Sequence, residues 1–411
     1  MVAPILRIRF LVLALLMGAG SYQAHGQGTL SGIVRDSLTR EPLELASIFL
    51  ASTTYGASTN DKSQFSILNV PAGQYDLIIS YLGYSLYKRT ITVGNGPQTL
   101  DLQLKPSTQH LQEVVVRPGS NRPGDYEKFA ETFLGRTVFS RQCRIRNPKA
   151  VYVQYNADRN ELTASSPTFL QVDNAALGYR IKYYGLEFTL NFREQYMSFY
   201  GWPVFQEMKP RNERQRQQWL QNRQRAYRGS LPHFLRSVYL NQVAAEGFLV
   251  QKMRVVPNPR FPRADSLAKA LRQARHNQPF SPADQDSIAR WTKVPRAFSL
   301  LYTAPRPIDS LRETDSGRVW LRFRDYVQIT YRHEAPDPNY QPVRPVGAPS
   351  LPAPTQQVST LMLHPLRAEV QANGQLLEPL AVFTDGYWGF EKMGEFLPTD
   401  YLPPTSAAPV R

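Results

Sequence analysis

Hydrophobic and polar residues alternate in short runs through the first quarter of the chain, after an apolar leader. Leu100, Leu102 and Leu104, for example, alternate with polar residues, which is the pattern of a strand with one buried face. Clusters of Gly, Asn and Pro interrupt such runs about every 8–12 residues, a spacing typical of a β-sandwich. The pattern therefore predicts an all-β sandwich over residues 27–104, followed by a linker over residues 105–124.

The pattern changes after the linker, where helical and strand-like periods follow one another. Residues 178–194 form the strongest alternating run, and Gly185 within it is expected to mark a bulge. A mostly helical block is expected between about residues 211 and 291. The predicted fold class is therefore α+β overall, with the sandwich followed by a mixed α+β domain over residues 125–403.

Local signals set the boundaries of several elements. Asp125 is expected to cap a helix that stops at Gly135, and Ser230 is expected to cap another that ends at Gly247. Residues 319–332 are expected to form one strand. Three further segments complete the organisation: a strand over residues 358–370, a proline-rich loop over residues 336–354 and a tail over residues 404–411.

The N-terminus has the features of a secretory signal peptide. Arg7 and Arg9 precede an apolar run, and the small residues Ala24 and Gly26 precede a cleavage point. The apolar run is short for a membrane span, and no later segment offers about 18 consecutive apolar residues. We therefore expect residues 1–26 to be a signal peptide, no transmembrane helix, and an exported protein in the periplasm or associated with the outer membrane.

The chain is strongly basic, with a formal net charge of +15, or +13 without the two leader arginines. An intracellular protein of this charge would suggest nucleic acid as a partner, but export removes that partner. The anions of a bacterial envelope are acidic glycans and phosphorylated lipids. We therefore expect an envelope protein, an anionic glycan or a lipid head group as the partner. The alternative is that the charge is a property of a soluble surface.

Ordered sequence blocks in the sandwich region resemble a known family. In this order the blocks are similar to the carboxypeptidase regulatory-like family, which is a transthyretin-like β-sandwich. Ser63 departs from the family, whose members usually have Gly after the turn Asp. The family takes its name from an accessory domain beside a peptidase, so the resemblance implies no peptidase activity. The blocks are Ser31-Gly32-Ile33-Val34 with Asp36, Glu41-Pro42-Leu43, Ala46-Ser47-Ile48, Thr59-Asn60-Asp61, Phe65, Val70-Pro71-Ala72-Gly73-Gln74-Tyr75 and Tyr81-Leu82-Gly83-Tyr84.

A zinc carboxypeptidase is the enzyme that this resemblance raises first. Such an enzyme needs three protein ligands for zinc and an open position for water. His110 and Glu113 have His-x-x-Glu spacing, and His233 lies later in the chain. However, His110 and Glu113 lie in the predicted linker, and His233 lies in the first turn of an amphipathic helix. We therefore expect no catalytic residue, no metal and no cofactor.

Other reactive side chains have structural explanations. Cys143 is the only cysteine, so an intramolecular disulfide is impossible and a buried thiol is expected. Asp284 is expected to cap a helix, while Asp286 is expected to be exposed. His333-Glu334 is expected to be a pair at a strand end rather than an acid/base dyad.

Two sets of residues are candidates for ligand binding. Residues 211–228 form a basic helical stretch, and arginine can bind phosphate or carboxylate with two parallel hydrogen bonds. The alternative is a solvated helix face. The second set is aromatic and could stack on sugar rings or pack in a core instead. The anion candidates are Arg214, Arg216, Arg223 and Arg225; the aromatic candidates are Trp202, Tyr387 and Trp388, accompanied by Tyr183, Tyr184 and Tyr200.

These observations give two functional hypotheses and a third that we favour less. The first is a non-enzymatic, exported cell-envelope protein in which the sandwich acts as a binding or assembly module. The second is a glycan-binding accessory of outer-membrane nutrient uptake. The third is the zinc carboxypeptidase.

Overall fold

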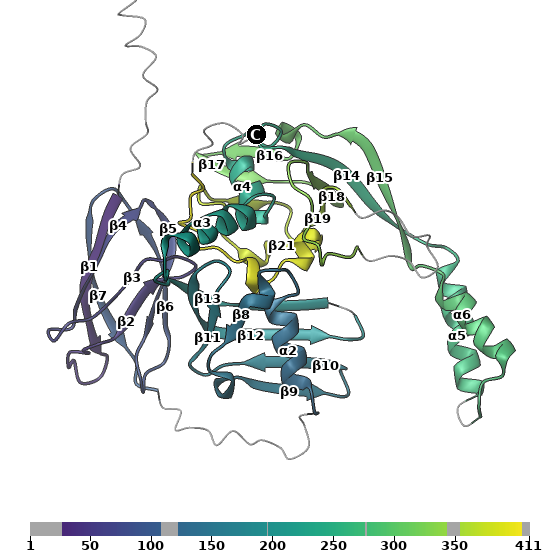
Figure 1. Ribbon diagram of the computed structural model, residues 1–411, viewed down its shortest axis with the longest axis horizontal. Helices are drawn as coiled ribbons and strands as arrows, with labels where there is room; N and C mark the ends of the chain where they lie inside the picture. Colours follow the sequence, from purple (N-terminus) through teal and green to yellow (C-terminus); the bar gives the residue numbers. More distant parts are fainter. Residues whose placement is uncertain (1–26, 108–121, 195, 276–277, 343–353, 405–411) are drawn as a thin grey trace, which may run out of the picture. The chain divides into compact units, whose positions relative to one another are not determined.

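The computed structural model describes residues 27–107, 122–194, 196–275, 278–342 and 354–404 (Figure 1). The chain divides into two compact units, of which the first contains strands β1–β7 and the second contains the elements from α2 onward. The predicted signal peptide, most of the predicted linker and the predicted tail lie outside the described residues. The α+β fold class, with a sandwich followed by a mixed region, is confirmed.

The first unit is a sandwich of two sheets. In the smaller sheet β1 is central, antiparallel to β4 and parallel to β7. The larger sheet has the order β3-β2-β5-β6, with antiparallel neighbours. The strands are β1 (Gln27–Asp36), β2 (Ser47–Leu50), β3 (Gly56–Ser58), β4 (Gln64–Pro71), β5 (Gly73–Ser80), β6 (Tyr87–Val93) and β7 (Pro97–Leu104).

The sandwich core follows from the alternation in the sequence. Every second residue of β1 is buried, including Leu30 and Val34, which have no exposed surface. Ile48 of β2 and Leu77 of β5 face the same core from the other sheet. Burying an aliphatic side chain of this size contributes about 1.5–3 kcal/mol to stability. Apolar burial therefore stabilises the predicted all-β sandwich without a disulfide.

Ser63 occupies a backbone conformation that favours glycine. Its φ is 56°, in the left-handed region, and its N–H donates to the carbonyl oxygen of Asn60 at 2.9 Å. The Asn60 side chain accepts the N–H groups of Lys62 and Gln64, at 3.0 and 2.8 Å. The turn therefore keeps its geometry although Ser63 replaces the Gly that the family usually has here.

The second unit begins with a six-stranded antiparallel sheet built around β12 (Tyr179–Asn191). The first half of β12 pairs with β11, the second half pairs with β10, and β13 runs along its other edge. The register between β12 and β13 shifts after Tyr184, so the bulge expected at Gly185 is present. The other strands are β8 (Cys143–Ile145), β9 (Tyr152–Asn156), β10 (Glu161–Ser165), β11 (Phe169–Asn174) and β13 (Tyr196–Glu207).

Helix α2 (Asp125–Leu134) packs its aromatic face on this sheet. The rings of Phe129 and Phe188 pack edge to face, with their centres 5.0 Å apart. The rings of Phe133 and Tyr183 do the same at 5.5 Å. The prediction that Asp125 is the cap is wrong by one residue, because Gly124 is the N-cap and Asp125 begins the helix. The Asp125 carboxylate instead accepts the N–H of Arg122 at 2.8 Å.

Helix α3 (Glu213–Tyr227) is attached to the same sheet by a buried arginine. The Arg223 guanidinium lies 3.9 Å from the ring centre of Tyr179, and its Nε donates to the carbonyl oxygen of Leu177 at 2.8 Å. Its Nη1 pairs with Glu207 of β13 at 2.6 Å. One side chain thus joins α3 to the turn before β12 and to β13.

Helix α4 (Leu231–Tyr239) follows α3 directly. Ser230 is its N-cap, as predicted, and accepts the N–H of His233 at 3.3 Å. The predicted end at Gly247 is wrong, because the helix ends at Tyr239 and Asn241 then has a φ of 58°.

A second sheet and a small third sheet complete the unit. The five-stranded sheet has the order β15-β14-β18-β19-β21, and the three-stranded sheet has the order β16-β17-β20. Neither of the long strands predicted here is continuous. The strands are β14 (Phe248–Pro257), β15 (Ala297–Pro305), β16 (Arg312–Asp315), β17 (Arg318–Leu321), β18 (Tyr326–Tyr331), β19 (Gln357–Leu363), β20 (Ala368–Val370) and β21 (Val382–Gly386), which leads into the short helix α7 (Tyr387–Phe390).

Strands β14 and β15 continue beyond the sheet as a two-stranded ribbon, which ends in a helical hairpin (Figure 1). The hairpin consists of α5 (Phe261–Ala274) and α6 (Pro282–Thr292). Ser281 and Asp284 form the expected capping box at the start of α6, and Asp286 is exposed as predicted. Among the described residues, no helix has the length and apolarity needed to cross a membrane.

We predict that Ser63→Gly gives a more stable protein than Ser63→Ala, by about 1 kcal/mol. Both variants lose the Ser63 hydroxyl, which donates to the Lys62 carbonyl oxygen at 2.7 Å, but only alanine keeps a Cβ in the left-handed conformation. Urea unfolding of the full chain measures the difference. Equal stability of the two variants would show that this backbone carries no strain.

We also predict that Arg223→Ala destabilises the second unit by about 3 kcal/mol. The substitution leaves the buried carbonyl oxygen of Leu177 without its donor and removes the partner of Glu207. Arg223→Lys keeps the charge but not the planar donor group, so we expect an intermediate loss. Arg216→Ala, at an exposed position of the same helix, is the matched control, and its unfolding midpoint should stay close to the parent value.

Candidate functional site

The four arginines proposed from the sequence do not converge on a ligand site. Arg223 is buried and fully engaged in the contacts described above, so it is unavailable to a ligand. Arg216 pairs with Glu213 on the same helix at 2.9 Å, and Arg225 lies 3.8 Å from Glu334. Arg214 is exposed and lies three helical turns away from Arg225, about 16 Å along the axis. The structure does not bring the four side chains together around one space, and anion binding by this helix stays a prediction.

The aromatic residues proposed from the sequence mostly belong to cores. Tyr387 and Trp388 are each 6% exposed, and the Trp388 indole donates to the carbonyl oxygen of Gly229 at 2.7 Å. They therefore offer no stacking surface to a ligand. Trp202 is half-buried and packs over Gly185, where an added Cβ would lie 2.3 Å from its ring. The close approach explains why the bulge in β12 contains a glycine.

His233, the histidine considered for zinc, has a structural role in the second unit. Its Nδ1 accepts the N–H of Gly229 at 3.1 Å, and its Nε2 lies 3.1 Å from Glu246. Burial lowers the pKa of His233, which keeps the ring neutral. His110 and Glu113 lie outside the described residues. Within the described ranges, no group of three His, Cys, Asp or Glu side chains could hold a metal ion.

The thiol of Cys143 is buried, as predicted from the sequence. Its Sγ lies 3.6 Å from the carbonyl oxygen of Phe139, and burial raises the pKa of the thiol to about 12. A thiol with this pKa is almost fully protonated at neutral pH, so it is a poor nucleophile.

The strongest concentration of positive charge around a cavity lies elsewhere in the second unit. A cavity of about 740 Å³ opens between the start of the β14–β15 ribbon and the three-stranded sheet. Six basic side chains line it, together with two acidic ones. The basic residues are Lys252, Arg306, Arg312, Arg322, Arg324 and Arg367, and the acidic residues are Asp309 and Glu313. We call this set the arginine cavity.

Three of these arginines are held in place by protein groups. Arg312 donates to the carbonyl oxygens of Val238 and Tyr239, at 2.9 and 3.2 Å, at the end of helix α4. A cation at this end of a helix is stabilised by the unpaired carbonyl groups and the helix dipole. Arg322 and Arg367 both pair with Glu313, at 3.2 and 3.4 Å, and Arg367 also lies 3.6 Å from Asp315.

The other three basic side chains have weaker protein partners. Arg306 donates from Nε to the Ser310 hydroxyl at 3.0 Å, which leaves its charge uncompensated. Lys252 lies 3.7 Å from Asp325, which it shares with Arg254. Arg324 is exposed, and no hydrogen bond or ion pair is present for it among the described residues.

The cavity is therefore strongly positive. Its six basic and two acidic lining residues give a formal charge of +4. Its volume falls in the range of about 300–1,000 Å³ that is usual for ligand sites. Guanidinium groups around an open cavity can each bind a phosphate or carboxylate with two hydrogen bonds. The arrangement is suited to an anion that carries more than one charged group.

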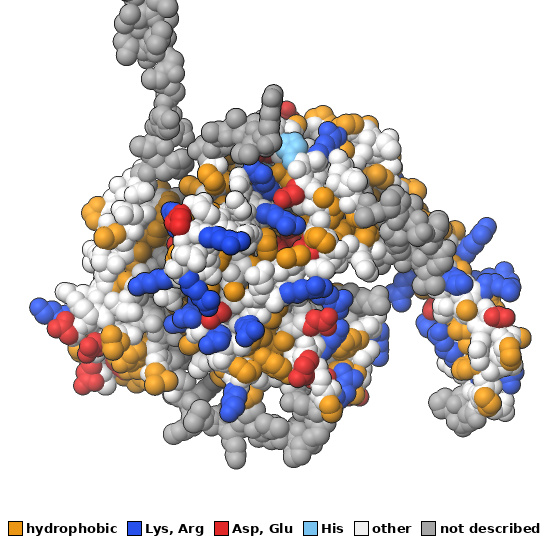
Figure 2. Space-filling model, viewed as in Figure 1, with side chains coloured by type: hydrophobic (Ala, Val, Ile, Leu, Met, Phe, Trp, Pro, Cys, Tyr) orange, Lys and Arg blue, Asp and Glu red, His pale blue; other side chains and the backbone are white. Residues whose placement is uncertain are grey.

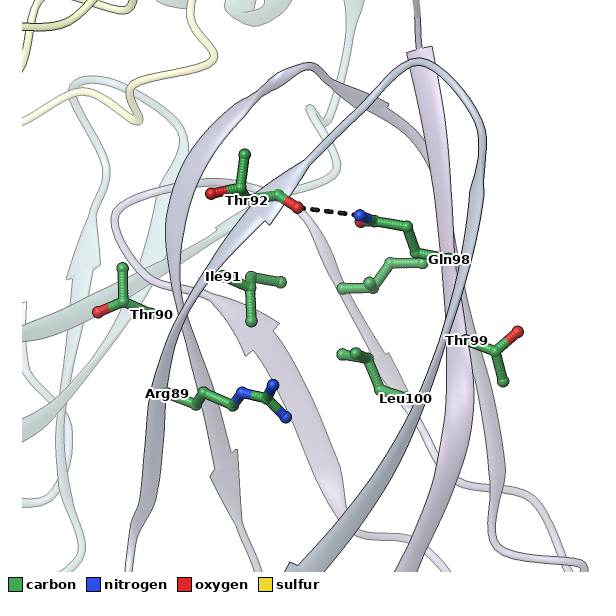
Figure 3. A pocket seen from close by; sticks show the side chains of 8 residues that line it. Arg89, Thr90, Ile91, Thr92, Gln98, Thr99 and Leu100 are labelled. Carbon is green, nitrogen blue, oxygen red and sulfur yellow. Dashed lines mark hydrogen bonds between the residues drawn. The ribbon is translucent and has the colours of Figure 1, made fainter.

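A second, smaller cavity lies in the sandwich between β6 and β7 (Figure 3). Its volume is about 360 Å³, and the side chains of Ile91 and Leu100 point into it. The Gln98 amide donates to the carbonyl oxygen of Thr92 at 3.0 Å across its upper end. Arg89 is its one basic lining residue, so this cavity suits a small polar ligand better than a polyanion.

A group of half-buried carboxyl side chains lies near helix α7. Burial raises the pKa of Glu334 and of Glu395, each to about 7, and that of Glu391 well above its usual range. The Oε2 atom of Glu334 is buried without a hydrogen-bond partner in the described structure. The Asp337 carboxylate is satisfied, because it accepts the N–H groups of Val138 and Asn339 at 2.9 and 2.8 Å. Neither cavity described above is lined by this group.

We predict that stability falls as pH rises from about 5 to about 7. Over this interval the folded state keeps protons on Glu334 and Glu395 that the unfolded state has released, since their pKa values rise from 4.5 to about 7. At about 1.4 kcal/mol per pKa unit, each group accounts for a loss of at most about 3 kcal/mol. The double variant Glu334→Gln/Glu395→Gln should make this pH dependence shallower in urea unfolding, while Glu391, whose pKa is also raised, keeps part of it.

Glu213→Gln is the matched control for this pH experiment. The pKa of Glu213 is lowered by its bonds to Gln217 and Arg216, so its titration lies below pH 4.5. It should leave the slope between pH 5 and 7 unchanged. Because the lowered pKa of His233 acts in the opposite direction over this interval, the test is the difference in slope between the parent and the double variant. An equal slope in both would contradict the protonated state of the two carboxyl groups.

Comparison with solved structures gives weak and partial likenesses. A cohesin–X-dockerin complex from Acetivibrio cellulolyticus is 20% identical, covering 18% of this chain and 52% of that chain, with a TM-score of 0.17. The pilus 2b backbone protein of group B streptococcus is 15% identical, covering 20% and 42%, with a TM-score of 0.18. A candidate carbohydrate-binding protein from Bacteroides uniformis is 11% identical, covering 43% and 79%, with a TM-score of 0.18.

The chain thus spans about half of the first two of these structures or less, and at these TM-scores the likenesses leave its function open. Comparison with curated proteins gave no match. The family comparison is specific: residues 30–116 match the CarboxypepD_reg-like domain. The resemblance seen in the sequence blocks is therefore confirmed, and the sandwich of this protein is similar to the CarboxypepD_reg-like domain.

Proposed function

We propose that this protein is a non-enzymatic, exported protein of the cell envelope that binds an anionic ligand in the arginine cavity. The sandwich serves as its binding or assembly module. The ligand carries phosphate or carboxylate groups and belongs to an acidic glycan or a phosphorylated head group. The protein acts in the periplasm or at the outer membrane, where such anions are present.

The observation that carries this proposal is the gathering of six basic side chains around one open cavity. Arginines spread over a surface are solvated and bind little. Here Glu313 holds Arg322 and Arg367 in fixed orientations, and the end of α4 holds Arg312. Fixed donors lose less conformational freedom when a ligand binds. The uncompensated charge of Arg306 supplies attraction for the ligand.

A second candidate function is glycan binding by the sandwich, in support of nutrient uptake. The polar cavity between β6 and β7 favours it, because Thr92, Gln98 and Arg89 present hydrogen-bonding groups beside apolar Ile91 and Leu100. Sugar rings combine apolar faces with hydroxyl groups, so a small site of this mixed character fits a neutral glycan.

We predict that Arg306→Gln/Arg324→Gln weakens binding of a phosphorylated oligosaccharide by at least about tenfold. Each lost charge-assisted hydrogen bond is worth about 1.5–3 kcal/mol, which corresponds to tenfold or more in Kd. The measurement is titration calorimetry of the full chain with delipidated lipopolysaccharide core, with polygalacturonate as the carboxylate probe and dextran as the neutral probe. Raising the salt concentration should lower the affinity for the two anions and leave the affinity for dextran unchanged.

Arg214→Gln/Arg216→Gln on helix α3 is the matched control, since it removes the same charge from exposed positions outside the cavity. It should leave the affinity for both anions nearly unchanged. If this control loses binding and the cavity variant keeps it, the binding site lies on α3 rather than in the arginine cavity. Saturable dextran binding that Gln98→Ala abolishes would favour the sandwich function, and stoichiometric zinc in the purified protein would contradict a non-enzymatic role.

A further inference from the structure

Strand β15 exposes an apolar surface that the rest of the described chain does not cover. Phe298, Leu300 and Tyr302 are 48%, 50% and 46% exposed. Phe298 and Leu300 alternate along the strand and therefore share one face of the ribbon, and Tyr302 follows them where the register between β14 and β15 shifts. β15 is the last strand of its sheet, so its outer edge is unpaired in the described structure. Exposed apolar groups of this kind mark a surface that contacts something else.

Basic residues lie on the same face of the ribbon. Arg254 is opposite Leu300, and Val256 is opposite Phe298, in the antiparallel register of β14 with β15. Residues directly opposite each other in such a pair project on one side. The ammonium group of Lys252 lies 5.6 Å from the ring centre of Tyr302. The face therefore combines aromatic and aliphatic side chains with cations.

The charge continues into the helical hairpin at the end of the ribbon, where Lys and Arg side chains crowd α5 and α6 (Figure 2). Residues 252–306 contain eleven Lys and Arg against three Asp, a formal charge of +8. This segment alone holds more than half of the net charge of the chain. The basic residues are Lys252, Arg254, Arg260, Arg263, Lys269, Arg272, Arg275, Arg290, Lys293, Arg296 and Arg306.

We propose that the face formed by Phe298, Leu300 and Tyr302 docks on the surface of a bilayer leaflet rich in anionic lipids. The apolar side chains enter the boundary between head groups and acyl chains, and the surrounding cations bind the lipid phosphates. Each Lys or Arg near such a surface contributes about 1 kcal/mol of attraction, and buried apolar area adds to it.

Charge complementarity selects this occupant over a second copy of the chain. Two copies that met through β15 would bring two segments of charge +8 together, which opposes association. A lipid leaflet offers both the negative charge and the apolar interior that the face matches. The apolar residues Phe298, Leu300 and Tyr302 do not line the arginine cavity, whereas Lys252 and Arg306 contribute charge to both surfaces.

The test is co-sedimentation of the full chain with vesicles of phosphatidylcholine alone or with three parts in ten of phosphatidylglycerol. We expect binding to the anionic vesicles that weakens with salt, and at least tenfold weaker binding for Phe298→Ser/Leu300→Ser. Leu38→Ser/Leu82→Ser is the matched control, because it removes two highly exposed leucines of the sandwich, and it should bind like the parent.

A fluorescent label reports whether the face enters the lipid. The single native cysteine is buried, so a dye attached to Leu300→Cys labels position 300 selectively. Its emission should shift to the blue on anionic vesicles, while the dye on Leu82→Cys should not respond. The proposal would be overturned if the emission of the dye at position 300 did not shift on anionic vesicles. It would also be overturned if Phe298→Ser/Leu300→Ser left vesicle binding unchanged.

The same variants also distinguish two other partners of this face, nucleic acid and a second copy of the chain. Tighter binding to duplex DNA than to anionic vesicles, or self-association lost in Phe298→Ser/Leu300→Ser without vesicle binding, would each overturn the proposal. Calorimetry with the soluble oligosaccharide separates this test from that of the cavity. Retained oligosaccharide binding with no vesicle binding would reject the docking face and leave the arginine cavity intact.

Discussion

The buried guanidinium of Arg223 is the contact on which the arrangement of α3 and the first sheet of the second unit depends. A buried cation is costly unless it is paired and its donors are satisfied. Arg223 meets both conditions, with Glu207 as the charge partner, two backbone carbonyl groups as acceptors and the Tyr179 ring as a stacking surface. Arg223 joins the helix to β13 and to the turn before β12, and Trp219 and Asn222 of the same helix donate to the carbonyl oxygens of Ala175 and Ala176 in that turn.

This contact also explains why the run of arginines in α3 does not converge on one space. With about 3.6 residues per turn, positions 214 and 225 lie on one side of α3 and positions 216 and 223 lie on the opposite side. The environment of each of the four also differs. The arginine cavity has the opposite character. Its residues come from β14, from the segment after β15, from β16 and from the residues that flank β17 and β20, yet the three-stranded sheet brings their guanidinium groups around one space. Proximity in the fold, rather than in the sequence, makes the site.

Much of the fold was predictable, because local signals agreed with the tertiary structure. The alternation in β1, the caps at Ser230 and Ser281 and the bulge at Gly185 are each specified by a few neighbouring residues. The two long strands were wrongly predicted as continuous because a single residue interrupts an apolar pattern in each. Asp325 has a φ of 66° and separates β17 from β18, and Pro365, which has no N–H to donate, lies between β19 and β20. A prediction from hydrophobic periodicity alone does not detect either interruption.

The candidate site could not be read from the sequence for a related reason. Arg322 and Arg324 are exposed and alternate with buried Leu321 and Phe323, an arrangement that the alternation in the sequence indicates. Which other residues share that face depends on the pairing of β16, β17 and β20, which are distant along the chain. Glu313 then contributes to the outcome, because it pairs with both Arg322 and Arg367, while Asp315 also lies 3.6 Å from Arg367. The excess of positive charge was visible from composition, but only the strand pairing turns it into an oriented set of donors.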